Sequence, residues 1–468
     1  MILNTNGIRK YLFIFYLPIF LFNTSIQAQE KTLTAQEKIY GLSKFWQEAN
    51  YNFAYFDNVP QLNFDSLYQA YIPQVLATKT NYDYYRLLQK FCASLKDGHT
   101  YIILPKDLRE KMFTPALEIN RINNHVFITN TGQSYSHSIP LGSEIIQVNG
   151  MDVLNYLNTE IYPYFSASTP HIRLNLGAQS MLKGLQGTSL TLKIQKPDQT
   201  FALVKIRREQ KNEAWVKPVS GNLPLVDFKL LEGNIGLLTI NTFVNSQVLD
   251  AFKQKLPEIH QSKALIIDLR RNNGGNGSVA MEILKHFTNQ EGFTTLAAST
   301  RKNLSSYRAS GSLSDTILTN LLGIGTIEVD EESKAYFAGN VWEKEPLHVI
   351  KNDLNTDKYL KPLVLLTGNQ TVSAAEDFLI TMENLKRGTR IGQATKGSTG
   401  QPLFFALPQG GLGAICTRKN TYPDGKKFVG IGVVPNIEVP LTLADYMGVH
   451  DSTLSKALDF INGLNAKN

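Results

Sequence analysis

The spacing of apolar residues along the chain changes twice, and each change marks a different kind of structure. In residues 31–100 apolar side chains recur every three or four positions, and Thr80 and Asp83 have capping-box spacing, so helices are expected. Residues 112–215 instead carry short alternating runs separated by Gly, Pro and Asn, which predicts a small β-rich unit. From about residue 226 strand patterns alternate with helix patterns, which predicts a mostly parallel sheet with helices on its faces.

The third region has the most regular pattern. Strands are expected at 235–240, 264–267, 363–366 and from 390 to 392, and helices at 248–259, 278–287 and 374–385. Residues 294–360 interrupt this alternation, which indicates an insertion. The pattern therefore predicts an α/β domain that follows a helical region and a β-rich unit.

Composition limits the class of protein. The chain has 468 residues, 43% of them apolar, which suits two to four domains and excludes a disordered chain. Its two cysteines, Cys92 and Cys416, are too few for a disulfide scaffold or a cysteine-rich zinc cluster. We expect both to be buried free thiols, and we expect no metal site and no cofactor.

The positive charge of the chain is spread out. A net charge of +7 comes with 47 lysines and arginines that include no run of five or more. This distribution is typical of a solvated basic surface, so no nucleic-acid partner is expected.

The N-terminus has the three-part pattern of a secretory signal. Arg9 and Lys10 precede the apolar stretch 11–22, and a polar segment then leads to the small residue Ala28. The stretch is short for a bilayer span, and no cysteine follows it to carry a lipid anchor. We expect export to the periplasm or the extracellular space, with no stable membrane span after cleavage. An uncleaved N-terminal anchor is the alternative.

Two junctions between a strand and a helix are candidate functional sites, because functional groups of α/β sheets collect where strands end. The first follows Asp268 and contains Gly274 and Gly275, whose N–H groups are suited to stabilising an anion. A tight structural turn is the alternative reading. The GxxxxGK[ST] order of a phosphate-binding loop is absent.

The second junction places Ser373 at the first turn of the expected helix 374–385. Free N–H groups and the positive end of the helix dipole can stabilise an oxyanion there, although a serine in this place is also a common N-cap. Catalysis would need a base as well. Among eight histidines, His99 differs from the others because it lies in a glycine-containing turn directly after an amphipathic helix.

Several motifs in a fixed order resemble the serine peptidase family of tail-specific (carboxyl-terminal-processing) and tricorn-type proteases. The resemblance spans roughly residues 35–440 and is carried by DGHT at 97–100, PLGSEIIQVNG at 140–150, DLRRNNGG at 268–275, SAAE at 373–376, GSTG at 397–400 and GVVP at 432–435. It implies a crotonase-like (ClpP-like) α/β protease core with an N-terminal helical region. It also implies an inserted PDZ-like β-rich domain that holds an extended peptide by strand addition, with Gly142, Ile145 and Ile146 as substrate-binding residues.

The family has two catalytic arrangements. Tail-specific members use a serine with a lysine, and aligning their lysine loop with this chain places Ser398 where that lysine belongs. Lys396 is two positions early, which on an extended segment displaces its amine by about 6–7 Å. The resemblance therefore favours the tricorn-like branch, in which a histidine is the base.

In that branch Ser373 is the nucleophile and His99 the general base. The oxyanion hole is formed by the N–H groups of Gly274 or Gly275 and of Ala374. Tricorn-like members also carry a glutamate just before the GVxPD-type segment, but residues 427–431 contain no acid. The nearest carboxylates are Asp424 and Glu438, and either Asp97 or a backbone carbonyl is left to orient His99.

The sequence thus predicts five segments: a signal peptide at 1–28, a helical domain at 29–110, a PDZ-like domain at 111–220, the peptidase core at 221–445 and a tail at 446–468. The expected function is an exported serine endopeptidase that cleaves extended or unfolded peptide segments through an acyl-enzyme. A non-catalytic peptide- or ligand-binding protein on the same fold is the alternative, and an acyl-CoA enzyme on the crotonase-like fold is a third reading. The sequence does not indicate an oligomeric state.

Overall fold

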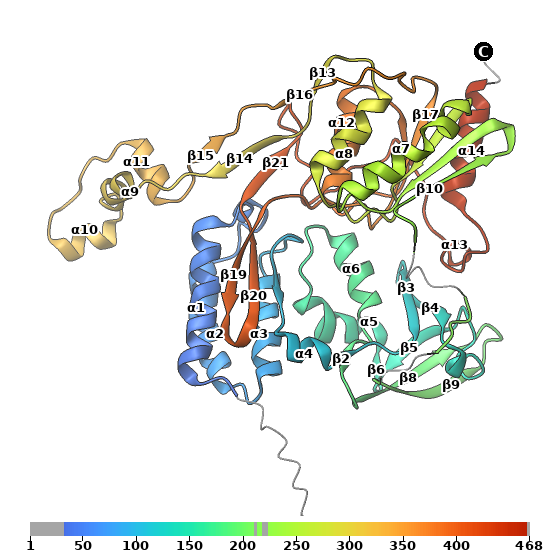
Figure 1. Ribbon diagram of the computed structural model, residues 1–468. Coiled ribbons are helices and arrows are strands. Elements are labelled where there is room, and N and C mark those ends of the chain that lie inside the picture. The colour runs from blue at the N-terminus through green and yellow to red at the C-terminus, as the bar shows by residue number, and fades with distance from the viewer. Residues whose placement is uncertain (1–31, 210–212, 218–222, 466–468) are drawn as a thin grey trace, which may run out of the picture. The chain divides into compact units, whose positions relative to one another are not determined.

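The computed structural model describes residues 32–209, 213–217 and 223–465 (Figure 1). Clustering of contacts places Leu33–Asn468 in one compact unit. The expected signal peptide at 1–28 lies outside the described residues. Among the helices that are described, none combines the length and the apolar character needed to span a membrane.

Helices form the first part of the described chain, as predicted. They are α1 (Ala35–Asn52), α2 (Phe64–Ala77) and α3 (Asn81–Ala93). The capping box of α3 is present, with Thr80 accepting from the Asp83 N–H and the Asp83 carboxylate accepting from the Thr80 N–H. Aromatic side chains fill the space between the helices, and the rings of Phe64 and Phe91 stack with centroids 4.9 Å apart.

The β-rich segment follows and has its own apolar core. Its sheet has the order β3 (Leu117–Ile122), β4 (His125–Thr131), β5 (Glu144–Val148), β8 (Ser189–Gln195) and β9 (Phe201–Arg207), with β6 (Met151–Asp152) beside β5. Short helices accompany it, namely α4 (Lys106–Glu110), α5 (Val153–Tyr156) and α6 (Pro170–Gln179), as do the paired strands β2 (Met112–Phe113) and β7 (Gly184–Leu185). The expected β-rich unit is confirmed, and it carries more helix than the alternating pattern indicated.

A six-stranded sheet forms the third part. Its order is β10 (Val226–Leu231), β11 (Ile235–Ile240), β12 (Ala264–Asp268), β17 (Leu363–Thr367), β18 (Thr389–Gly392) and β22 (Ile437–Glu438). Every neighbouring pair is parallel except β10 with β11, which confirms the mostly parallel sheet.

Each face of this sheet packs against helices, because successive side chains of a strand point to opposite sides. Leu265 and Ile267 join the core cluster that includes residues of α7 (Ser246–Gln261), α8 (Gly277–Leu284) and α12 (Ala374–Asn384). Ala264 and Ile266 join the cluster with residues of α14 (Ser452–Asn465). The segment 446–468, expected as a tail, therefore contributes a helix that covers one face of the sheet.

The predicted insertion between α8 and β17 has structure of its own. It contains β13 (Gly292–Thr294), β14 (Ala297–Arg301), α9 (Ser305–Ser312), α10 (Thr316–Leu322), α11 (Glu331–Phe337), β15 (Trp342–Lys344) and β16 (Val349–Lys351). Strand β14 pairs with both β15 and β21 (Arg418–Thr421). Helices α9, α10 and α11 lie beyond this ribbon, away from the six-stranded sheet (Figure 1).

A three-stranded sheet joins the helical region to the end of the α/β region. Strand β20 (Gly411–Cys416) pairs with β1 (Tyr101–Ile103) on one side and with β19 (Pro402–Leu407) on the other. Figure 1 shows the β19–β20 hairpin beside α1, and the rings of Phe45 on α1 and Phe405 on β19 lie 6.0 Å apart. Residues far apart in sequence are therefore held together around the start of β1.

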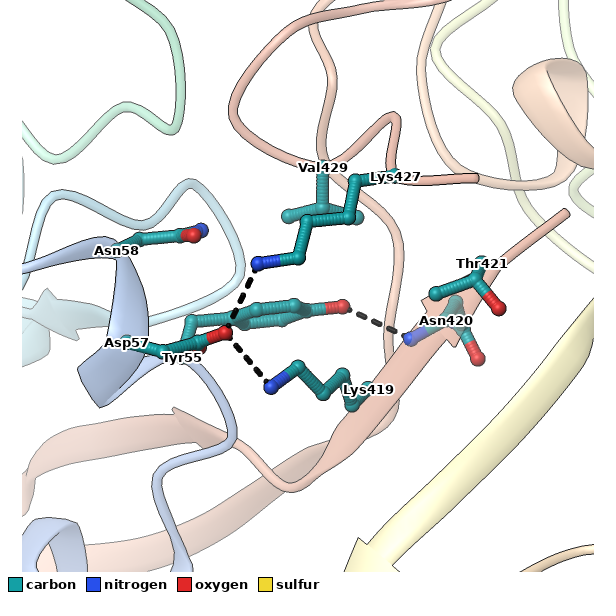
Figure 2. Close-up of a pocket in the computed structure, with 8 residues that line it drawn as sticks. All are labelled: Tyr55, Asp57, Asn58, Lys419, Asn420, Thr421, Lys427 and Val429. Atoms are coloured by element: carbon teal, nitrogen blue, oxygen red, sulfur yellow. Dashed lines mark hydrogen bonds and ion pairs between the residues drawn. The ribbon is translucent and has the colours of Figure 1, made fainter. Parts of the chain in front are cut away.

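Ionic contacts reinforce this junction (Figure 2). The Asp57 carboxylate accepts from Lys419 at 2.8 Å and from Lys427 at 3.1 Å. The Asn420 N–H donates to the Tyr55 hydroxyl at 3.0 Å. These bonds fix the turn at Phe56–Asn58, which follows α1, against β21 and the loop after it.

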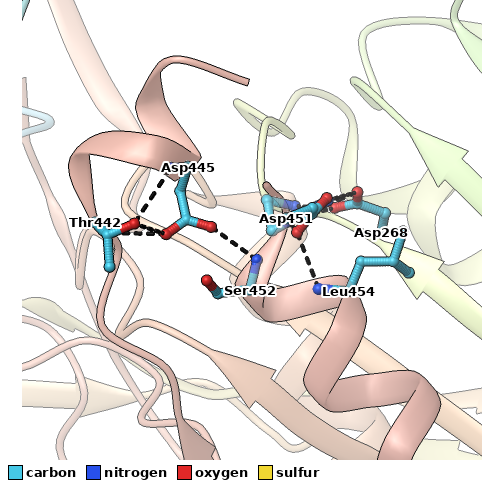
Figure 3. Close-up of polar contacts among 7 residues, drawn as sticks. Asp268, Thr442, Asp445, Asp451, Ser452 and Leu454 are labelled. Atoms are coloured by element: carbon cyan, nitrogen blue, oxygen red, sulfur yellow. Dashed lines mark hydrogen bonds and ion pairs between the residues drawn. The ribbon is translucent and has the colours of Figure 1, made fainter. Parts of the chain in front are cut away.

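Helix α14 is anchored to the sheet by an arginine between two aspartates (Figure 3). Arg270 binds Asp268, at the end of β12, with Nη2 2.7 Å from the carboxylate. The same guanidinium binds Asp451, just before α14, with Nη1 at 2.7 Å. Burial raises the pKa of Asp451, but the hydrogen bonds and charge of Arg270 outweigh it and hold that pKa below its usual range.

This anchor predicts a modest, pH-dependent contribution to stability. We expect Asp451→Asn to lower the free energy of unfolding by about 1 kcal/mol, because solvent screens a partly exposed ion pair. Urea unfolding at pH 7 measures it. The matched control is Glu331→Gln, which breaks the exposed Glu331–Lys334 pair on α11 and should change stability by less than about 0.5 kcal/mol.

The sign of the pH dependence follows from the lowered pKa. The Asp451 carboxylate stabilises the folded state fully above the unfolded pKa of about 4, and this stabilisation is lost as pH falls through the lower folded value. The difference between wild type and Asp451→Asn should therefore shrink as the pH is lowered below about 4. Equal effects of the two variants at pH 7 would contradict the anchoring role.

Candidate active site

Ser373 lies between β17 and α12 in an unusual backbone conformation. Its φ of 57° and ψ of −125° differ from the extended conformation of an ordinary N-cap. A non-glycine residue in such a region costs roughly 1–3 kcal/mol and persists only where the surrounding structure enforces it. The reading of Ser373 as a simple helix cap is therefore disfavoured.

The glycine turn after β12 is pressed against Ser373. A Cβ on Gly274 would lie 2.8 Å from the Cβ of Ser373 and 2.7 Å from the carbonyl oxygen of Val372. Gly274 has a φ of 83° and Gly275 a φ of 137°, both in the region that favours glycine. The two junctions that the sequence singled out are thus one place in the structure.

Asn272 makes hydrogen bonds to both junctions. Its buried side chain donates to the Ile240 carbonyl at 3.0 Å and accepts from the Gly274 N–H at 2.9 Å. Its own carbonyl accepts from the Val372 N–H at 3.2 Å. The Gly274 N–H is therefore already engaged.

The N–H groups of Gly275 and Ala374 differ from that of Gly274 in their hydrogen bonding. Within the described ranges, no acceptor lies in hydrogen-bonding geometry to either of them. Of the two glycines named from the sequence, Gly275 is thus the one with a donor available to a ligand.

Ser398 contacts both candidate catalytic residues. Its Oγ lies 2.6 Å from Nδ1 of His99, and its carbonyl accepts from the N–H of Ser373 at 3.2 Å. A Cβ on Gly98 would lie 2.8 Å from the same Oγ, so the turn before His99 approaches Ser398 closely. The structure therefore brings the His99 turn and the Ser373 turn together on either side of Ser398.

The His99 turn is fixed by two neighbouring segments. The Ser168 hydroxyl, from the loop before α6, donates to Asp97 at 3.0 Å and accepts from the Gly98 N–H at 2.9 Å. On the other side Thr100 accepts from the N–H of Cys416 on β20 at 3.0 Å. The residues on either side of His99 are thus held by contacts from the β-rich segment and from the three-stranded sheet.

Glu376 ties the 395–398 loop to the start of α12. Its fully buried carboxylate accepts from the N–H groups of Ser373 at 3.1 Å, Gly397 at 2.6 Å and Ser398 at 3.1 Å, and from the Thr395 hydroxyl. Burial raises the pKa of Glu376 to about 7, although these hydrogen bonds to the carboxylate oppose the shift. Removing Glu376 would free four donors around the site.

The loop also packs against the GVVP segment and the β-rich segment. Val433 donates its N–H to Thr395 Oγ1 at 2.7 Å, and the Gly430 N–H donates to the Gly397 carbonyl at 2.9 Å. His171 on α6 lies 3.1 Å from the Thr395 carbonyl through Nε2. Residues of the DGHT, SAAE and GVVP motifs therefore all contact the 395–398 loop.

Charges near His99 act on its imidazole in opposite directions. Burial lowers the pKa of His99, the Asp97 carboxylate raises it, and the Lys396 ammonium lowers it. The pKa of Lys396 is itself lowered by burial, against the effect of Glu376. Lys396 is thus close enough to act on the site, although Ser398 makes the contact with the imidazole.

Neither carboxylate near the expected glutamate position bonds to His99. Asp424 accepts from the N–H of Lys426 within its own turn, and Glu438 is exposed on β22. Ser398 and Glu376 were given no role by the sequence, although both stand inside the GSTG and SAAE motifs. Their presence as polar residues inside these two motifs was the signal in the sequence that could have identified them.

The substrate-binding residues expected in the β-rich segment lie in and beside β5. Ile145 is completely buried in the apolar core of that segment. Ile146, on the opposite side of β5, is half-buried. Gly142 forms a turn with a φ of 83°.

Two further expectations concern metals and thiols. Cys92 and Cys416 are both buried and free, as predicted. In the part of the chain that the structure describes, no group of three or more His, Cys, Asp and Glu side chains is arranged to hold a metal ion.

Comparison with known proteins agrees with this arrangement. Residues 234–439 match the model of peptidase family S41, a span that includes β11, the glycine turn, Ser373 and the 395–398 loop. A carboxyl-terminal-processing protease of Picosynechococcus sp. (strain ATCC 27264 / PCC 7002 / PR-6) is 22% identical over 369 residues, which cover 77% of this chain and 74% of the relative.

Solved structures show the same fold at low sequence identity. Mature CPAF complexed with lactacystin superposes with a TM-score of 0.67 at 16% identity, covering 92% of this chain and 98% of that one. A putative peptidase from Parabacteroides merdae ATCC 43184 gives 0.50 at 16% identity, covering 92% and 96%. The match of residues 234–439 to peptidase family S41 and the similarity to a carboxyl-terminal-processing protease indicate a serine-type peptidase, a hydrolase.

Proposed function

We propose that the protein is an exported serine endopeptidase in which Ser373 is the nucleophile and His99 the general base, as in the tricorn-like branch of the family. The observation that carries the proposal is the pair of hydrogen bonds made by Ser398, which holds the His99 imidazole beside the turn of Ser373. The strained conformation of Ser373 supports it, because such strain is common at catalytic turns.

The chemistry fixes which tautomer of His99 is needed. Nδ1 of His99 is engaged by Ser398, so a general base acting on Ser373 would use Nε2, which must then be unprotonated while Nδ1 carries the hydrogen. Nδ1–H then donates to Ser398 Oγ at 2.6 Å. Ser398 thus performs the orienting role that an acid has in related enzymes, and it does so from the position where tail-specific members place their lysine.

Asp97 acts on the His99 imidazole through its charge, and no hydrogen bond joins the two side chains in the described residues. Asp97 is buried at 2% exposure, and its negative charge favours the protonated form of His99. This is the form that arises when the base has taken the hydroxyl proton of Ser373, before the proton passes to the leaving amine. The N–H groups of Gly275 and Ala374 would stabilise the oxyanion of the tetrahedral intermediate.

The remaining parts of the proposal concern substrate and location. The β-rich segment is proposed as a PDZ-like module for an extended peptide, supported by its five-strand antiparallel path and its own core. Export rests on the pattern of residues 1–28, and N-terminal sequencing of the protein from its native host tests it: a chain that still begins at Met1 would contradict cleavage.

Loss of the nucleophile is the first test. Ser373→Ala should lower kcat/KM for peptide hydrolysis by at least about 10⁴-fold, and a fluorophosphonate probe should label the wild type but not the variant. Ser246→Ala, at the first turn of α7 and exposed, is the matched control and should retain both activities. Hydrolysis that survives in Ser373→Ala would leave the chain as a binding protein on a peptidase fold, with the measured activity arising elsewhere.

Removal of the orienting hydroxyl is the second test. Ser398→Ala should reduce kcat by roughly 10²-fold with little change in KM, because the imidazole loses the partner that fixes its tautomer. Ser398→Thr, which keeps the hydroxyl, should recover most of the rate. Nitrogen-15 spectra of His99 should show the Nδ1–H tautomer in the wild type and a mixture in Ser398→Ala, a change that a purely structural residue would not produce. An unchanged tautomer with unchanged kcat would exclude this role.

The pH dependence of kcat/KM is the third test. Because burial lowers the pKa of His99, the activity should persist below the ordinary histidine value of about 6.5 before protonation of the base abolishes it. Asp97→Asn should move this acid limb to lower pH, since the Asp97 charge raises the pKa. Lys396→Met should move it to higher pH, since the Lys396 charge lowers the pKa. Shifts in the same direction for both variants would contradict His99 as the titrating base.

A further inference from the structure

The three-stranded sheet beside the site is apolar on both of its faces. Antiparallel sheets at a protein surface normally alternate apolar and polar residues, with the polar side in water. Here none of the strand sequences YII, PLFFAL and GLGAIC contains a charged residue. On one face Ile102 and Ile415 are buried in the main core, and only Leu403, opposite Ile415 at the sheet edge, is exposed there, at 38%.

The other face carries two rows of apolar side chains. Tyr101 and Phe404 both stand opposite Ala414, so these three residues form one row across β1, β20 and β19. Ile103 and Ala406 both stand opposite Leu412 and form the second row. The rings of Tyr101 and Phe404 meet edge to face, with centroids 6.5 Å apart. We call these two rows the apolar face.

Part of the apolar face is exposed, although Ala414 at the centre of its first row is fully buried. Phe404 is 53% exposed and Leu412 39% exposed, whereas single apolar residues at a surface are normally scattered. Side chains so placed are stabilised when an apolar partner covers them.

The apolar face begins at the candidate catalytic residues. Strand β1 starts two residues after His99, and strand β19 starts four residues after Ser398. Both strands are antiparallel to β20, so they run parallel to each other and away from the site. The row with Tyr101 and Phe404 is therefore nearer the site, and the row with Leu412 follows about 7 Å farther along.

We propose that the apolar face binds the substrate on one side of the cleaved bond, and that it selects peptide segments with large apolar side chains at alternate positions. This inference rests on the proposed function and specifies its substrate class. An extended peptide places side chains on one side every two residues, about 6–7 Å apart, which matches the spacing of the two rows.

The free edge of β19 gives such a peptide a partner for its backbone. Within the described residues β19 pairs with β20 alone and forms the edge of the sheet. An added strand at this edge would extend the sheet, and the apolar rows would contact its side chains. A polar or charged segment would leave the rows exposed and gain no comparable contact.

Binding can be measured apart from catalysis in the Ser373→Ala protein. Two fluorescent peptides of equal length and charge are compared by anisotropy, one with Leu or Phe at alternate positions and one with Ser or Gln there. We expect the apolar peptide to bind at least about tenfold more tightly, and Phe404→Ala to weaken its binding about tenfold without affecting the polar peptide. The matched control is Leu321→Ala on α10, where Leu321 is 79% exposed and far from both proposed peptide-binding segments in the chain; it should leave both affinities unchanged.

Turnover in the chain with Ser373 intact supplies the second readout. Phe404→Ala should raise KM for the apolar peptide about tenfold, with labelling of Ser373 by fluorophosphonate unchanged. Labelled Ser373 with no effect of Phe404→Ala on either peptide would overturn the apolar face and leave the proposed function standing. Absence of labelling would overturn the proposed function, and the anisotropy result would still decide whether the face binds apolar peptides. A dimer in sedimentation velocity that Phe404→Ala dissociates would instead assign the face to a second copy of the chain and overturn the inference.

Discussion

The hydrogen bonds of Ser398 are the interaction on which the candidate site depends. Its hydroxyl holds Nδ1 of His99 and its carbonyl holds the N–H of Ser373, so one residue sets the positions of two that are far apart in the chain. Ser398 is positioned in turn by the buried Glu376 carboxylate, which accepts from its N–H and from that of Ser373. A movement of this loop would therefore displace His99 and Ser373 together.

The rest of the fold holds this loop in place. Parallel strands end at one edge of the six-stranded sheet, where Asn272 joins the glycine turn to the turn of Ser373. The β-rich segment reaches the same place through Ser168 and His171, and the three-stranded sheet does so through Cys416. The six-stranded sheet, the β-rich segment and the three-stranded sheet thus all contribute contacts to the candidate site. The chemistry proposed there involves two side chains, those of His99 and Ser373. The contacts from three segments explain why so many glycines cluster there, since backbones that approach this closely leave no room for a Cβ.

The partner of His99 Nδ1 is a neutral serine hydroxyl and not a carboxylate, which affects the stability of the protonated imidazole. A hydroxyl can fix the tautomer of an imidazole, but it stabilises the protonated imidazole less than a charged partner does. In this chain the negative charge is supplied separately by Asp97, which is buried nearby and is held by Ser168. In the proposed mechanism Ser398 would orient the imidazole and Asp97 would supply the negative charge.

The sequence by itself determined the elements and their order. Periods of 3.6 and 2 residues located the helices of the first region, the β-rich unit and the strands of the sheet, because these periods depend only on which side chains must be buried. Local turn chemistry also marked Ser373, His99 and the glycine turn as unusual. The sequence did not show which of Ile145 and Ile146 faces the core, because a one-residue shift along a strand moves a side chain from the surface to the core.

Only the tertiary structure decided which residues orient the base. The sequence search looked for an acid near residues 427–431, where linear order in the family places it, and found none. The contact with His99 comes instead from Ser398, 299 positions away in sequence. The apolar face could not be recognised in the sequence either, because the segments YII, PLFFAL and GLGAIC are each typical of buried strands. Their exposure on one side follows from which strands pair and what covers them, and these long-range contacts are not encoded in the local pattern of any one segment.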